Sequence, residues 1–337
     1  MKVTMIPGDG IGQEIAKSTM DVINASGAKI DWEIVQAGEA VYNETGKLIP
    51  DEVFKSLETN KVGIKGPITT PIGTGFRSAN VALRKKYDLF TNIRPIQSIG
   101  KLDTKFENLD LILFRENTED LYAGVEKKVS EDEMHSIKII TRHGSERIIR
   151  KAFDYAKNNN RKHVTVVTKA NIMKLTDGLF LEIAREIAKE YPDIPLHEIL
   201  VDNMAMQLVI DPNQFDVIVT QNLYGDILSD LMAGLIGGLG IIPGANIGDN
   251  LAIFEAVHGS ASDIAGKDLA NPTALILSGC MMLEYINELE AADIIRKALD
   301  KVLSQPGNFT TDLGGNTSTK EFTSILIHQI KTLKGRV

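Results

Sequence analysis

The sequence contains a single cysteine, Cys280, among its 337 residues. One cysteine excludes a disulfide within the chain, and it also excludes zinc or iron–sulfur sites built from several thiolates. A metal bound by this chain would therefore have oxygen ligands, which favours magnesium or manganese.

The chain also lacks an excess of positive charge, since 37 lysines and arginines stand against 45 aspartates and glutamates. The formal net charge of -8 gives no general attraction to nucleic acid or to an anionic membrane, so neither is expected as a partner. An anionic substrate would have to be bound by a local cluster of arginines.

Long hydrophobic runs are absent from the sequence as well. The most apolar stretch, residues 231–242, is too short to span a bilayer and is interrupted by glycines. No secretory signal is visible, because Met1 and Lys2 lead directly into a strand-like run, Val3 to Ile6. These features predict a cytoplasmic location.

Short β-rich runs alternate with amphipathic helical patterns through most of the length, which predicts an α/β protein of about two domains. The strand candidates include 111–114, 164–167 and 217–219, and the helix candidates include 145–158, 177–191, 289–303 and 319–333. The last of these helices opens with a capping-box pattern, Ser318 followed by Glu321.

Between Tyr122 and Ile140, a charged segment, 126–133, precedes an alternating one, 137–139. This pattern is compatible with a two-stranded arm that projects from the body of the protein. A solvated surface hairpin and a role in subunit pairing explain it equally well.

Two aspartates stand four residues apart in the segment 222–230, shortly after the apolar run 217–219. If a helix begins near Gly225, Asp226 and Asp230 lie on one face a turn apart and can share one divalent cation. The spacing therefore indicates a metal-assisted enzyme.

The opening turn, residues 7–12, has the sequence Pro-Gly-Asp-Gly-Ile-Gly and follows a strand-like run. It departs from the dinucleotide-binding fingerprint, because Gln13 occupies the position of the third glycine. A tight strand-to-helix turn explains these glycines without any ligand.

Polar side chains follow several strand candidates, namely Arg115, Lys169, Asp202 and Asp226. Because ligands of open α/β sheets bind at the carboxyl ends of strands, these four side chains are expected to converge on one cleft. Each alone has a simpler explanation: Asp226 can complement a helix N-terminus, Lys169 can be a solvated charge and Asp202 can cap a helix. Their combination favours a binding site.

Arginines supply the complementary charge. The segment from Ser78 to Arg84 predicts a helix start with Asn80 and Arg84 on one face, and Arg94 and Arg115 are further candidates. Guanidinium groups pair with carboxylates through two hydrogen bonds, so three of them beside a metal suit a polycarboxylate. Ser78 either caps the helix or contacts the ligand.

Several blocks of residues occur in a characteristic order along the chain. They are Thr69-Thr70-Pro71, Arg77-Ser78-x-Asn80-x-x-Leu83-Arg84, and the segments 114–122, 169–174, 222–226, 243–248 and 255–259. Together they closely resemble the isocitrate and isopropylmalate dehydrogenase family of metal-dependent β-decarboxylating dehydrogenases. The resemblance extends from about residue 3 to 333.

The resemblance implies a fold distinct from the Rossmann fold. A large discontinuous α/β domain, residues 1–89 and 237–337, would form the cofactor side. A small α/β domain, residues 90–236, would carry the metal site and the dimer interface. Its arm, at about 122–141, would clasp a counterpart across the axis of a homodimer with shared active sites.

The resemblance also implies how a tricarboxylate substrate is bound. The residues that match the family's substrate-binding positions are Ser78, Asn80, Arg84, Arg94 and Arg115. In this assignment Ser78 and Asn80 lie near the distal carboxylate of the substrate.

The family's metal and proton-transfer positions match five further residues. Asp226 and Asp230 from one chain and Asp202 from the other would hold magnesium or manganese. Tyr122 and the partner's Lys169 would transfer protons: Lys169, with Asp202, helps to deprotonate the 2-hydroxyl, and Tyr122 returns a proton after carbon dioxide leaves. Metal loss should therefore stop both oxidation and decarboxylation.

The loop after His258 and Gly259 matches the family's adenosine-ribose site. There Asp263 can accept hydrogen bonds from two ribose hydroxyls and would repel a 2′-phosphate, while Ile264 offers that phosphate no donor. NAD is therefore the expected cofactor. Other matching cofactor positions are Thr70, Asn171, Asn271 and Asp312.

The expected reaction is the NAD-dependent oxidative decarboxylation of isocitrate to 2-oxoglutarate through oxalosuccinate. Ser78 and Asn80 match the isocitrate enzymes, and a polar pocket disfavours the isopropyl group of 3-isopropylmalate. Homoisocitrate stays open, because one methylene changes binding by only about 1 to 3 kcal/mol. A noncatalytic regulatory subunit of a mixed oligomer is a further hypothesis, although the presence of the full catalytic and metal-binding set speaks against it.

Overall fold

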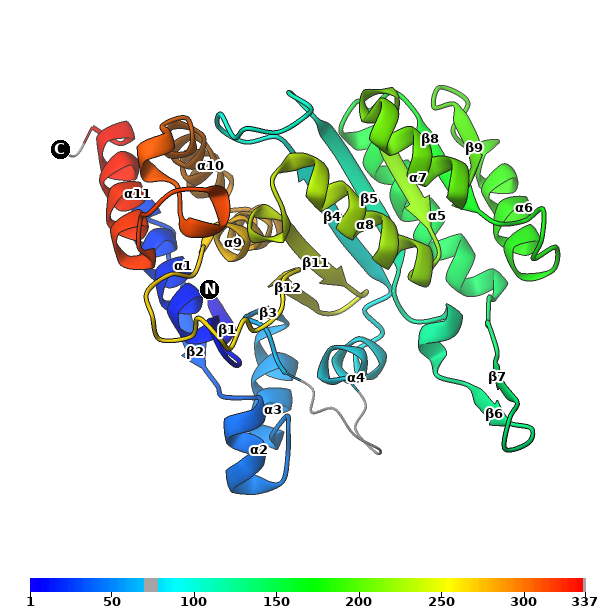
Figure 1. Cartoon of the computed structure of the whole chain (residues 1–337), viewed down its shortest axis with the longest axis horizontal. Coiled ribbons are helices and arrows are strands. Elements are labelled where there is room, and N and C mark those ends of the chain that lie inside the picture. The colour runs from blue at the N-terminus through cyan, green and yellow to red at the C-terminus, as the bar shows by residue number, and fades with distance from the viewer. Residues whose placement is uncertain (70–77, 336–337) are drawn as a thin grey trace.

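The computed structural model describes residues 1–69 and 78–335 (Figure 1). Its strands are β1 (Lys2–Ile6), β2 (Asp31–Ile34), β3 (Val62–Lys65), β4 (Thr91–Gln97), β5 (Asp110–Glu116), β6 (Glu126–Lys128), β7 (Met134–Ser136), β8 (Val164–Thr168), β9 (Leu196–Leu200), β10 (Val217–Thr220), β11 (Pro243–Ile247) and β12 (Ala252–Ala256). Its helices are α1 (Gly12–Ser26), α2 (Glu39–Thr45), α3 (Asp51–Asn60), α4 (Ala79–Lys86), α5 (Arg142–Asn158), α6 (Thr176–Ala188), α7 (Val201–Ile210), α8 (Asn222–Ile236), α9 (Thr273–Tyr285), α10 (Leu289–Leu303) and α11 (Thr319–Leu333).

Ten strands form one sheet in the order β2-β1-β3-β12-β11-β4-β5-β10-β8-β9. The first four are parallel to one another, and so are the last four. Between these groups, β11 and β4 pair antiparallel with each other and with their outer neighbours. The α/β prediction is confirmed, and the antiparallel centre distinguishes this sheet from the all-parallel Rossmann arrangement.

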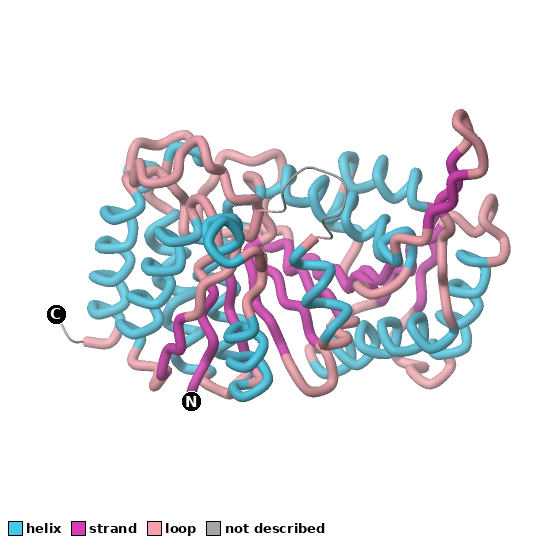
Figure 2. Tube along the Cα trace, turned by 90° about the horizontal axis from the view of Figure 1, so that it is seen from below, coloured by secondary structure: helices cyan, strands magenta, loops and turns pink. Residues whose placement is uncertain are grey.

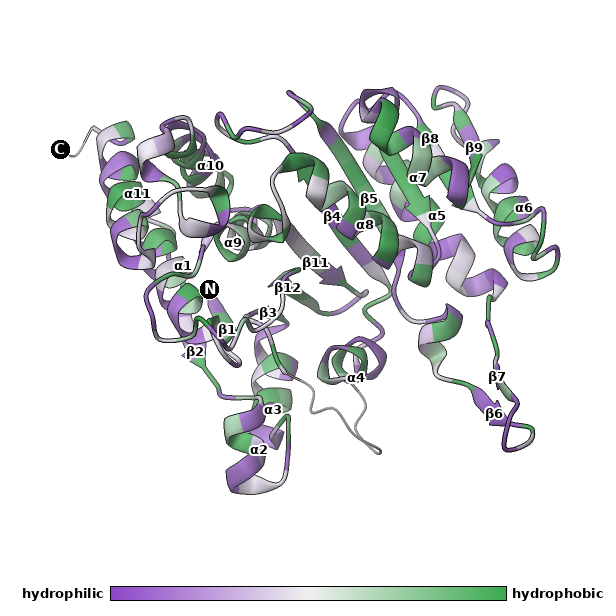
Figure 3. Ribbon diagram, in the orientation of Figure 1, coloured by the Kyte–Doolittle hydropathy of each residue, from purple (hydrophilic) through white to green (hydrophobic). Residues whose placement is uncertain are grey.

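Side chains along β5 alternate between two cores on opposite faces of the sheet. Ile112 and Phe114 pack in the core beneath α5 and α6, whereas Leu111 and Leu113 pack in the core with α7 and α8. In Figure 3, β5 and α8 are accordingly largely hydrophobic. Because strand side chains alternate with period two, Arg115 continues the second set and faces α8.

The other half of the sheet is covered by the helices from the two ends of the chain. α1, α9, α10 and α11 share one core, and α1 and α11 lie side by side, with Ser18 and Thr323 joined through their hydroxyls at 2.9 Å. The predicted limits of α10 and α11 are confirmed, and Ser318 accepts the backbone N–H of Glu321 at 3.2 Å. None of the helices in the described ranges is both long and apolar enough to cross a membrane.

Strands β6 and β7 form a separate two-stranded sheet that projects from the body (Figures 1 and 2). The second strand is Met134–Ser136 and not the alternating residues 137–139. Lys138, within those residues, is largely buried and pairs with Asp177 at 2.6 Å. Exposed apolar side chains on or beside this arm are Val125, Val129, Met134 and Ile137. The two-domain division and the clasping role of the arm stay predictions.

Candidate active site

A pocket of about 290 Å³, here called the central pocket, lies over the middle strands of the sheet. Its walls come from β3, β12, β11, β4 and β5, together with α4 and the start of α8. The predicted site residues that line it are Ser78, Asn80, Arg84, Arg94, Arg115, Tyr122, Asp226, His258 and Gly259.

Arg115 is fixed between β5 and the first turns of α8. It is 1% exposed, and its Nε and Nη2 donate to the side-chain oxygen of Asn222 at 3.0 and 2.7 Å. Its Nη1 forms a short ion pair with Asp226. Burial, followed by the charge of Arg84, lowers the pKa of Arg115. The guanidinium is therefore held rigidly while its charge is only partly compensated.

Arg94 extends from the neighbouring strand β4 and is also buried. Its Nε donates to Asn92 at 2.9 Å, and its Nη1 makes a short hydrogen bond to Ser229 on α8. Burial, followed by repulsion from Arg115 and Arg84, lowers the pKa of Arg94 to about 10. The arginines predicted to bind substrate therefore lie close enough to repel one another.

Two charged residues of the pocket, Lys65 and Glu255, were not predicted from the sequence. Strand pairing of β3 with β12 places them side by side, and Lys65 Nζ lies 2.5 Å from Glu255 Oε2. Arg84 approaches the other carboxylate oxygen at 3.2 Å. Burial alone would raise the pKa of Glu255, but Lys65 and Arg84 outweigh it and hold that pKa far below its ordinary value. Glu255 thus anchors one of the three predicted arginines.

The described lining of the central pocket contains four cationic side chains against two carboxylates. Neutral groups are also free to meet a ligand: Asn80 Oδ1 is buried without a hydrogen-bond partner. Ser78 occupies the N-cap position of α4, but its side chain makes no capping hydrogen bond. The charge balance and these free polar groups favour an anionic ligand with several oxygens.

Asp226 and Asp230 lie one turn apart on α8, as the spacing predicted. Tyr122 donates a short hydrogen bond to Asp226, and Arg94 lies 3.7 Å from Asp230. Burial would raise the pKa of Asp226, but Arg115 and the hydrogen bond from Tyr122 lower it overall. Burial raises the pKa of Asp230, and burial followed by the bond to Asp226 raises that of Tyr122.

Lys169 and Asp202 form a separate pair that does not line the central pocket. Lys169 Nζ lies 2.7 Å from Asp202 Oδ1, and Asp202 is 65% exposed. The backbone N–H of Lys169 donates to Asp177 at 2.6 Å, which fixes the turn after β8. The four strand-end side chains therefore gather as two pairs, Arg115 with Asp226 and Lys169 with Asp202, rather than in one cleft.

The carboxylates predicted to bind a metal do not all meet within the described part of one chain. In residues 1–69 and 78–335, no group of three or more histidine, cysteine, aspartate or glutamate side chains is gathered closely enough to hold a metal ion. Asp226 and Asp230 supply two carboxylates, and Asp202 of the same chain is not gathered with them.

A cavity of about 240 Å³ adjoins the central pocket and shares His258 and Gly259 with it. Three predicted cofactor residues, Ile264, Asn271 and Asp312, line this adjoining cavity, and Asn271 donates to Asp312 at 3.0 Å. Burial lowers the pKa of His258, which favours the neutral imidazole.

The remaining predicted cofactor residues lie outside these two spaces. Asp263 is exposed beside Ile264, and Asn171 is exposed in the turn after β8. Neither is part of the described lining of the central pocket or the adjoining cavity. Thr70 lies outside the described residues.

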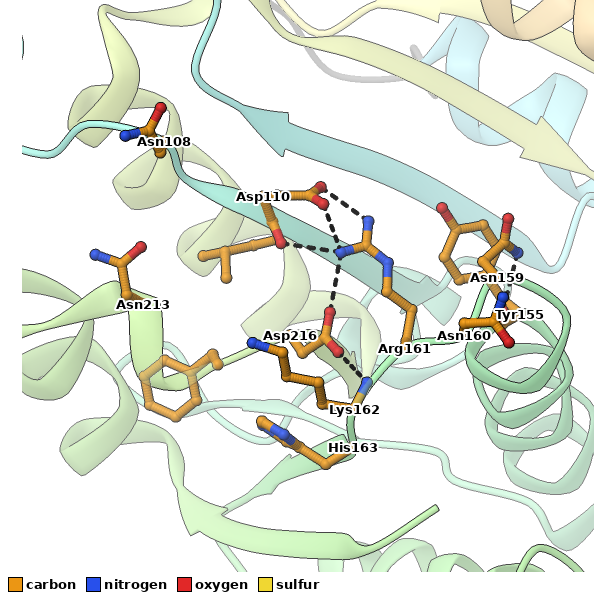
Figure 4. A pocket seen from close by; sticks show the side chains of 12 residues that line it. Asn108, Asp110, Tyr155, Asn159, Asn160, Arg161, Lys162, His163, Asn213 and Asp216 are labelled. Atoms are coloured by element: carbon orange, nitrogen blue, oxygen red, sulfur yellow. Dashed lines mark hydrogen bonds and ion pairs between the residues drawn. The ribbon is translucent and has the colours of Figure 1, made fainter. Parts of the chain in front are cut away.

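A larger cavity, of about 460 Å³, opens at the amino ends of β5, β8 and β10 and is called the amino-end cavity (Figure 4). There Arg161 donates to both carboxylate oxygens of Asp110 at 2.8 Å and to Asp216 at 3.0 Å. None of the predicted site residues lines this cavity. Arg161 is saturated by carboxylates that belong to β5 and to the start of β10, so it joins two strands.

The comparisons with known proteins agree with the resemblance. The family model for isocitrate/isopropylmalate dehydrogenase matches residues 2–326. The chain is 52% identical to a mitochondrial NAD isocitrate dehydrogenase regulatory subunit of Dictyostelium discoideum, over 98% of this chain and 92% of that protein. It is 49% identical to the mitochondrial NAD isocitrate dehydrogenase catalytic subunit 5 of Arabidopsis thaliana, over 96% of this chain and 87% of that protein.

A solved structure extends this likeness to the fold. The crystal structure of isocitrate dehydrogenase from Methylococcus capsulatus matches with a TM-score of 0.94 and 50% identity, over 98% of this chain and 99% of that chain. The predicted fold class is therefore confirmed.

The prediction of a cytoplasmic location is wrong by this comparison, because the named curated relatives are mitochondrial proteins. That prediction relied on the absence of a secretory signal, and such an absence does not identify a compartment.

The curated relatives are also named as subunits, one of them regulatory and another catalytic, so they do not support the predicted homodimer. What they share with this chain is nearly full-length similarity, and the family model covers almost the same span. The chain therefore belongs to the isocitrate/isopropylmalate dehydrogenase family.

Proposed function

We propose that this chain is a catalytic subunit of an NAD-dependent isocitrate dehydrogenase that converts isocitrate to 2-oxoglutarate and carbon dioxide. The observation that carries the proposal is the trio of buried arginines in the central pocket, where cationic side chains outnumber carboxylates. Buried charge without full compensation is costly unless a ligand completes it. A tricarboxylate supplies the missing negative charge and matches the paired donors of the guanidinium groups.

Substrate selection is assigned to Ser78 and Asn80, the neutral polar residues of the central pocket. The hydroxyl of Ser78 makes no capping bond and the amide oxygen of Asn80 is unpartnered, so both are available to oxygen-bearing groups. An isopropyl group placed there would leave buried polar atoms unsatisfied, which costs about 1–3 kcal/mol for each. This favours isocitrate over 3-isopropylmalate, while homoisocitrate is the nearest competitor.

The carboxylates of Asp226 and Asp230 suit magnesium or manganese, because both ions prefer oxygen ligands and a helix turn separates the two side chains. Water and substrate oxygens can complete the coordination of such an ion, and Asp202 of a second subunit is proposed as a further ligand. When bound, the ion would polarise the substrate hydroxyl and its neighbouring carboxylate, and NAD would accept the hydride.

The protein's own contribution to the reaction is to hold the substrate and to move protons. Arg84, Arg94 and Arg115 orient the carboxylates. Lys169 of a second subunit, assisted by Asp202, takes the hydroxyl proton. After carbon dioxide leaves, Tyr122 returns a proton to carbon, a role that its raised pKa and its bond to Asp226 support.

The choice of NAD rests on the loop beside the adjoining cavity. Asp263 is exposed there, and Ile264 lines the cavity. A carboxylate accepts hydrogen bonds from ribose hydroxyls and repels the 2′-phosphate of NADP. Replacing Asp263 by lysine and Ile264 by tyrosine should therefore shift the ratio of NADP to NAD activity upward. An unchanged ratio would contradict the assignment.

A second subunit of the same fold is proposed to complete the site. α7 carries Asp202 and α8 carries Asp226 and Asp230, and both helices expose apolar side chains: Met206, Val209, Ile210 and Ile227. A second subunit that packed on these apolar side chains would remove them from water, and it would bring its own Asp202 to the metal site.

The test is NADH or NADPH formation with isocitrate, homoisocitrate, 3-isopropylmalate and tartrate, each with NAD or NADP and with or without magnesium. Isocitrate with NAD and magnesium should give the highest rate. A preference for 3-isopropylmalate would overturn the role given to Ser78 and Asn80.

A regulatory subunit is the second candidate, because the Dictyostelium relative with 52% identity carries that description. In that case the purified chain would be inactive with every acid and would change the rate of an added catalytic subunit. Activity of the chain alone excludes this alternative.

A further inference from the structure

The glycine-rich turn between β1 and α1 has no role in the proposed function so far. Gly8 and Gly10 adopt positive φ angles of 75° and 56°. A Cβ on Gly8 would lie 2.1 Å from the carbonyl oxygen of Pro67, and one on Gly10 would lie 2.0 Å from that of Ser260. The turn is therefore wedged between two other loops, which explains its glycines without a bound nucleotide.

Asp9, at the centre of this turn, bridges two distant backbone segments. Its Oδ1 accepts the N–H of Glu39 at the start of α2, and its Oδ2 accepts the N–H of Thr69, both at 2.8 Å. No ion pair of Asp9 occurs within the described ranges, where its carboxylate accepts only these two backbone N–H groups. Its charge is thus satisfied by peptide N–H groups, and such charge-assisted hydrogen bonds are stronger than neutral ones.

Further bonds tie the same loops together. The backbone N–H groups of Asp9 and Ile11 donate to Pro67 at 2.7 Å and to Ser260 at 2.9 Å. The Thr69 hydroxyl donates to the Ser260 hydroxyl at 2.9 Å. Three segments, around residues 9, 68 and 260, consequently form one braced unit.

This braced unit lies where the two proposed ligand spaces meet. Pro67, Ile68 and Ser260 line the central pocket, and Ile11 lines the adjoining cavity. His258 and Gly259, which line both, immediately precede Ser260. A dinucleotide that spans the adjoining cavity and the central pocket must pass this wall.

We propose that Asp9 is a positioning residue that holds the wall between the central pocket and the adjoining cavity in the shape that NAD requires. This inference rests on the proposed function. Asp9 acts through the backbone of residues 67–69 and of residues 258–260, and it contacts neither the substrate nor the cofactor.

Asp9→Asn tests the proposal, with Asp31→Asn as the matched control. An asparagine has one acceptor oxygen and an amide N–H₂ group, so one of the two bridging bonds is replaced by a contact between donors. Asp31 is exposed at the start of β2 and makes no side-chain hydrogen bond or ion pair with the described residues, so its variant removes the same charge without removing a bridge.

Asp9→Asn should raise KM for NAD about tenfold, the size expected from ~1.4 kcal/mol for one hydrogen bond to a charged acceptor. It should change kcat and KM for isocitrate less than about threefold, and Asp31→Asn should change none of them. A general loss of folded protein would instead lower kcat, so this pattern separates positioning from stability.

Hydrogen exchange followed by mass spectrometry gives a readout that needs no activity. The segment containing the Thr69 amide should exchange about tenfold faster in Asp9→Asn than in the wild type or in Asp31→Asn. An unchanged exchange rate, or a KM for NAD that stays the same when exchange rises, overturns the inference. If the wild type has no isocitrate activity, the proposed function fails, and the positioning role is then decided by the Kd for NAD, which should rise about tenfold in Asp9→Asn and stay unchanged in Asp31→Asn. A Kd for NAD that is unchanged in Asp9→Asn overturns the positioning role.

Discussion

At its amino end β5 carries Asp110, which is held by Arg161, whereas near its carboxyl end it carries Arg115, which lines the central pocket. In the amino-end cavity two cationic side chains face two carboxylates. Among the described residues of the central pocket, four cationic side chains face two carboxylates. Strand β5 thus connects a cluster whose charges balance, at its amino end, to a cluster with an excess of positive charge, near its carboxyl end.

The balance of charge distinguishes a structural ion cluster from a binding site better than the volume of the cavity does. The amino-end cavity is the larger, at about 460 Å³ against about 290 Å³. Its arginine already has carboxylate partners, and burying further charge there would bring no compensation. Burial, followed by repulsion from Arg115 and Arg84, lowers the pKa of Arg94, and an anion bound in the central pocket would relieve that repulsion.

The largest effect is expected from Arg115→Lys, which keeps the charge but removes the planar fork that reaches Asn222 and Asp226. A lysine in this place can no longer form the paired hydrogen bonds that the guanidinium group is proposed to make to a substrate carboxylate. With these two charge-assisted hydrogen bonds lost, kcat/KM for isocitrate should fall about 1000-fold. Steady-state kinetics measure this. Arg161→Lys is the matched control and should leave kcat/KM within about threefold, so a comparable loss in both variants would remove the distinction between the two ends of β5.

A smaller effect is expected from Tyr122→Phe, which removes the hydroxyl that donates to Asp226. If Tyr122 returns a proton to carbon, kcat should fall about 100-fold while KM changes little, because acid–base groups typically contribute 10²- to 10⁴-fold. Tyr155→Phe, at the amino-end cavity, is the control and should retain full activity. Unchanged kcat in Tyr122→Phe would rule out the assigned role.

Arg161→Lys should act on stability rather than on catalysis. The substitution removes part of the double contact with Asp110 and leaves Asp216, which is 6% exposed, less well paired. We expect the free energy of unfolding to fall by about 1–2 kcal/mol. Urea denaturation monitored by circular dichroism gives this value. Stability equal to that of the wild type would mean that the cluster does not hold the strands together.

The smallest effect concerns pH. Burial would raise the pKa of Asp110, but hydrogen bonds from Arg161 and Gln97 outweigh it and lower the pKa below its ordinary value. A depressed carboxyl pKa stabilises the fold above the ordinary value near pH 4, and this stabilisation is lost as the pH falls further.

The wild type should therefore exceed Asp110→Asn in unfolding free energy at pH 7 by less than about 1 kcal/mol, since Asp110 is half exposed. Denaturation curves at several pH values should show this difference shrinking below about pH 4. A difference that grew toward acid would reverse the sign of the argument.

Part of this architecture was predictable because it depends on local spacing. The limits of α10 and α11 follow from apolar periodicity, and the Ser318 cap follows from a short motif. The placement of Asp226 and Asp230 one turn apart required only that α8 begin near the predicted residue.

The remainder depends on which strands become neighbours, and local patterns do not encode that. Lys65 and Glu255 lie 190 residues apart in the sequence and meet only because β3 pairs with β12. Lys169 and Asp202 follow strands as predicted, but β8 and β9 lie at one end of the sheet, away from the central pocket. The position of a residue at the end of a strand therefore predicts exposure to a ligand only when the strand order is known.

Calorimetric titration of isocitrate with magnesium into the wild type, Arg115→Lys and Arg161→Lys tests the central claim most directly. The account predicts that Arg115→Lys weakens isocitrate binding by more than tenfold, while Arg161→Lys binds as the wild type does. Equal affinities in all three proteins, or a loss confined to Arg161→Lys, would contradict it.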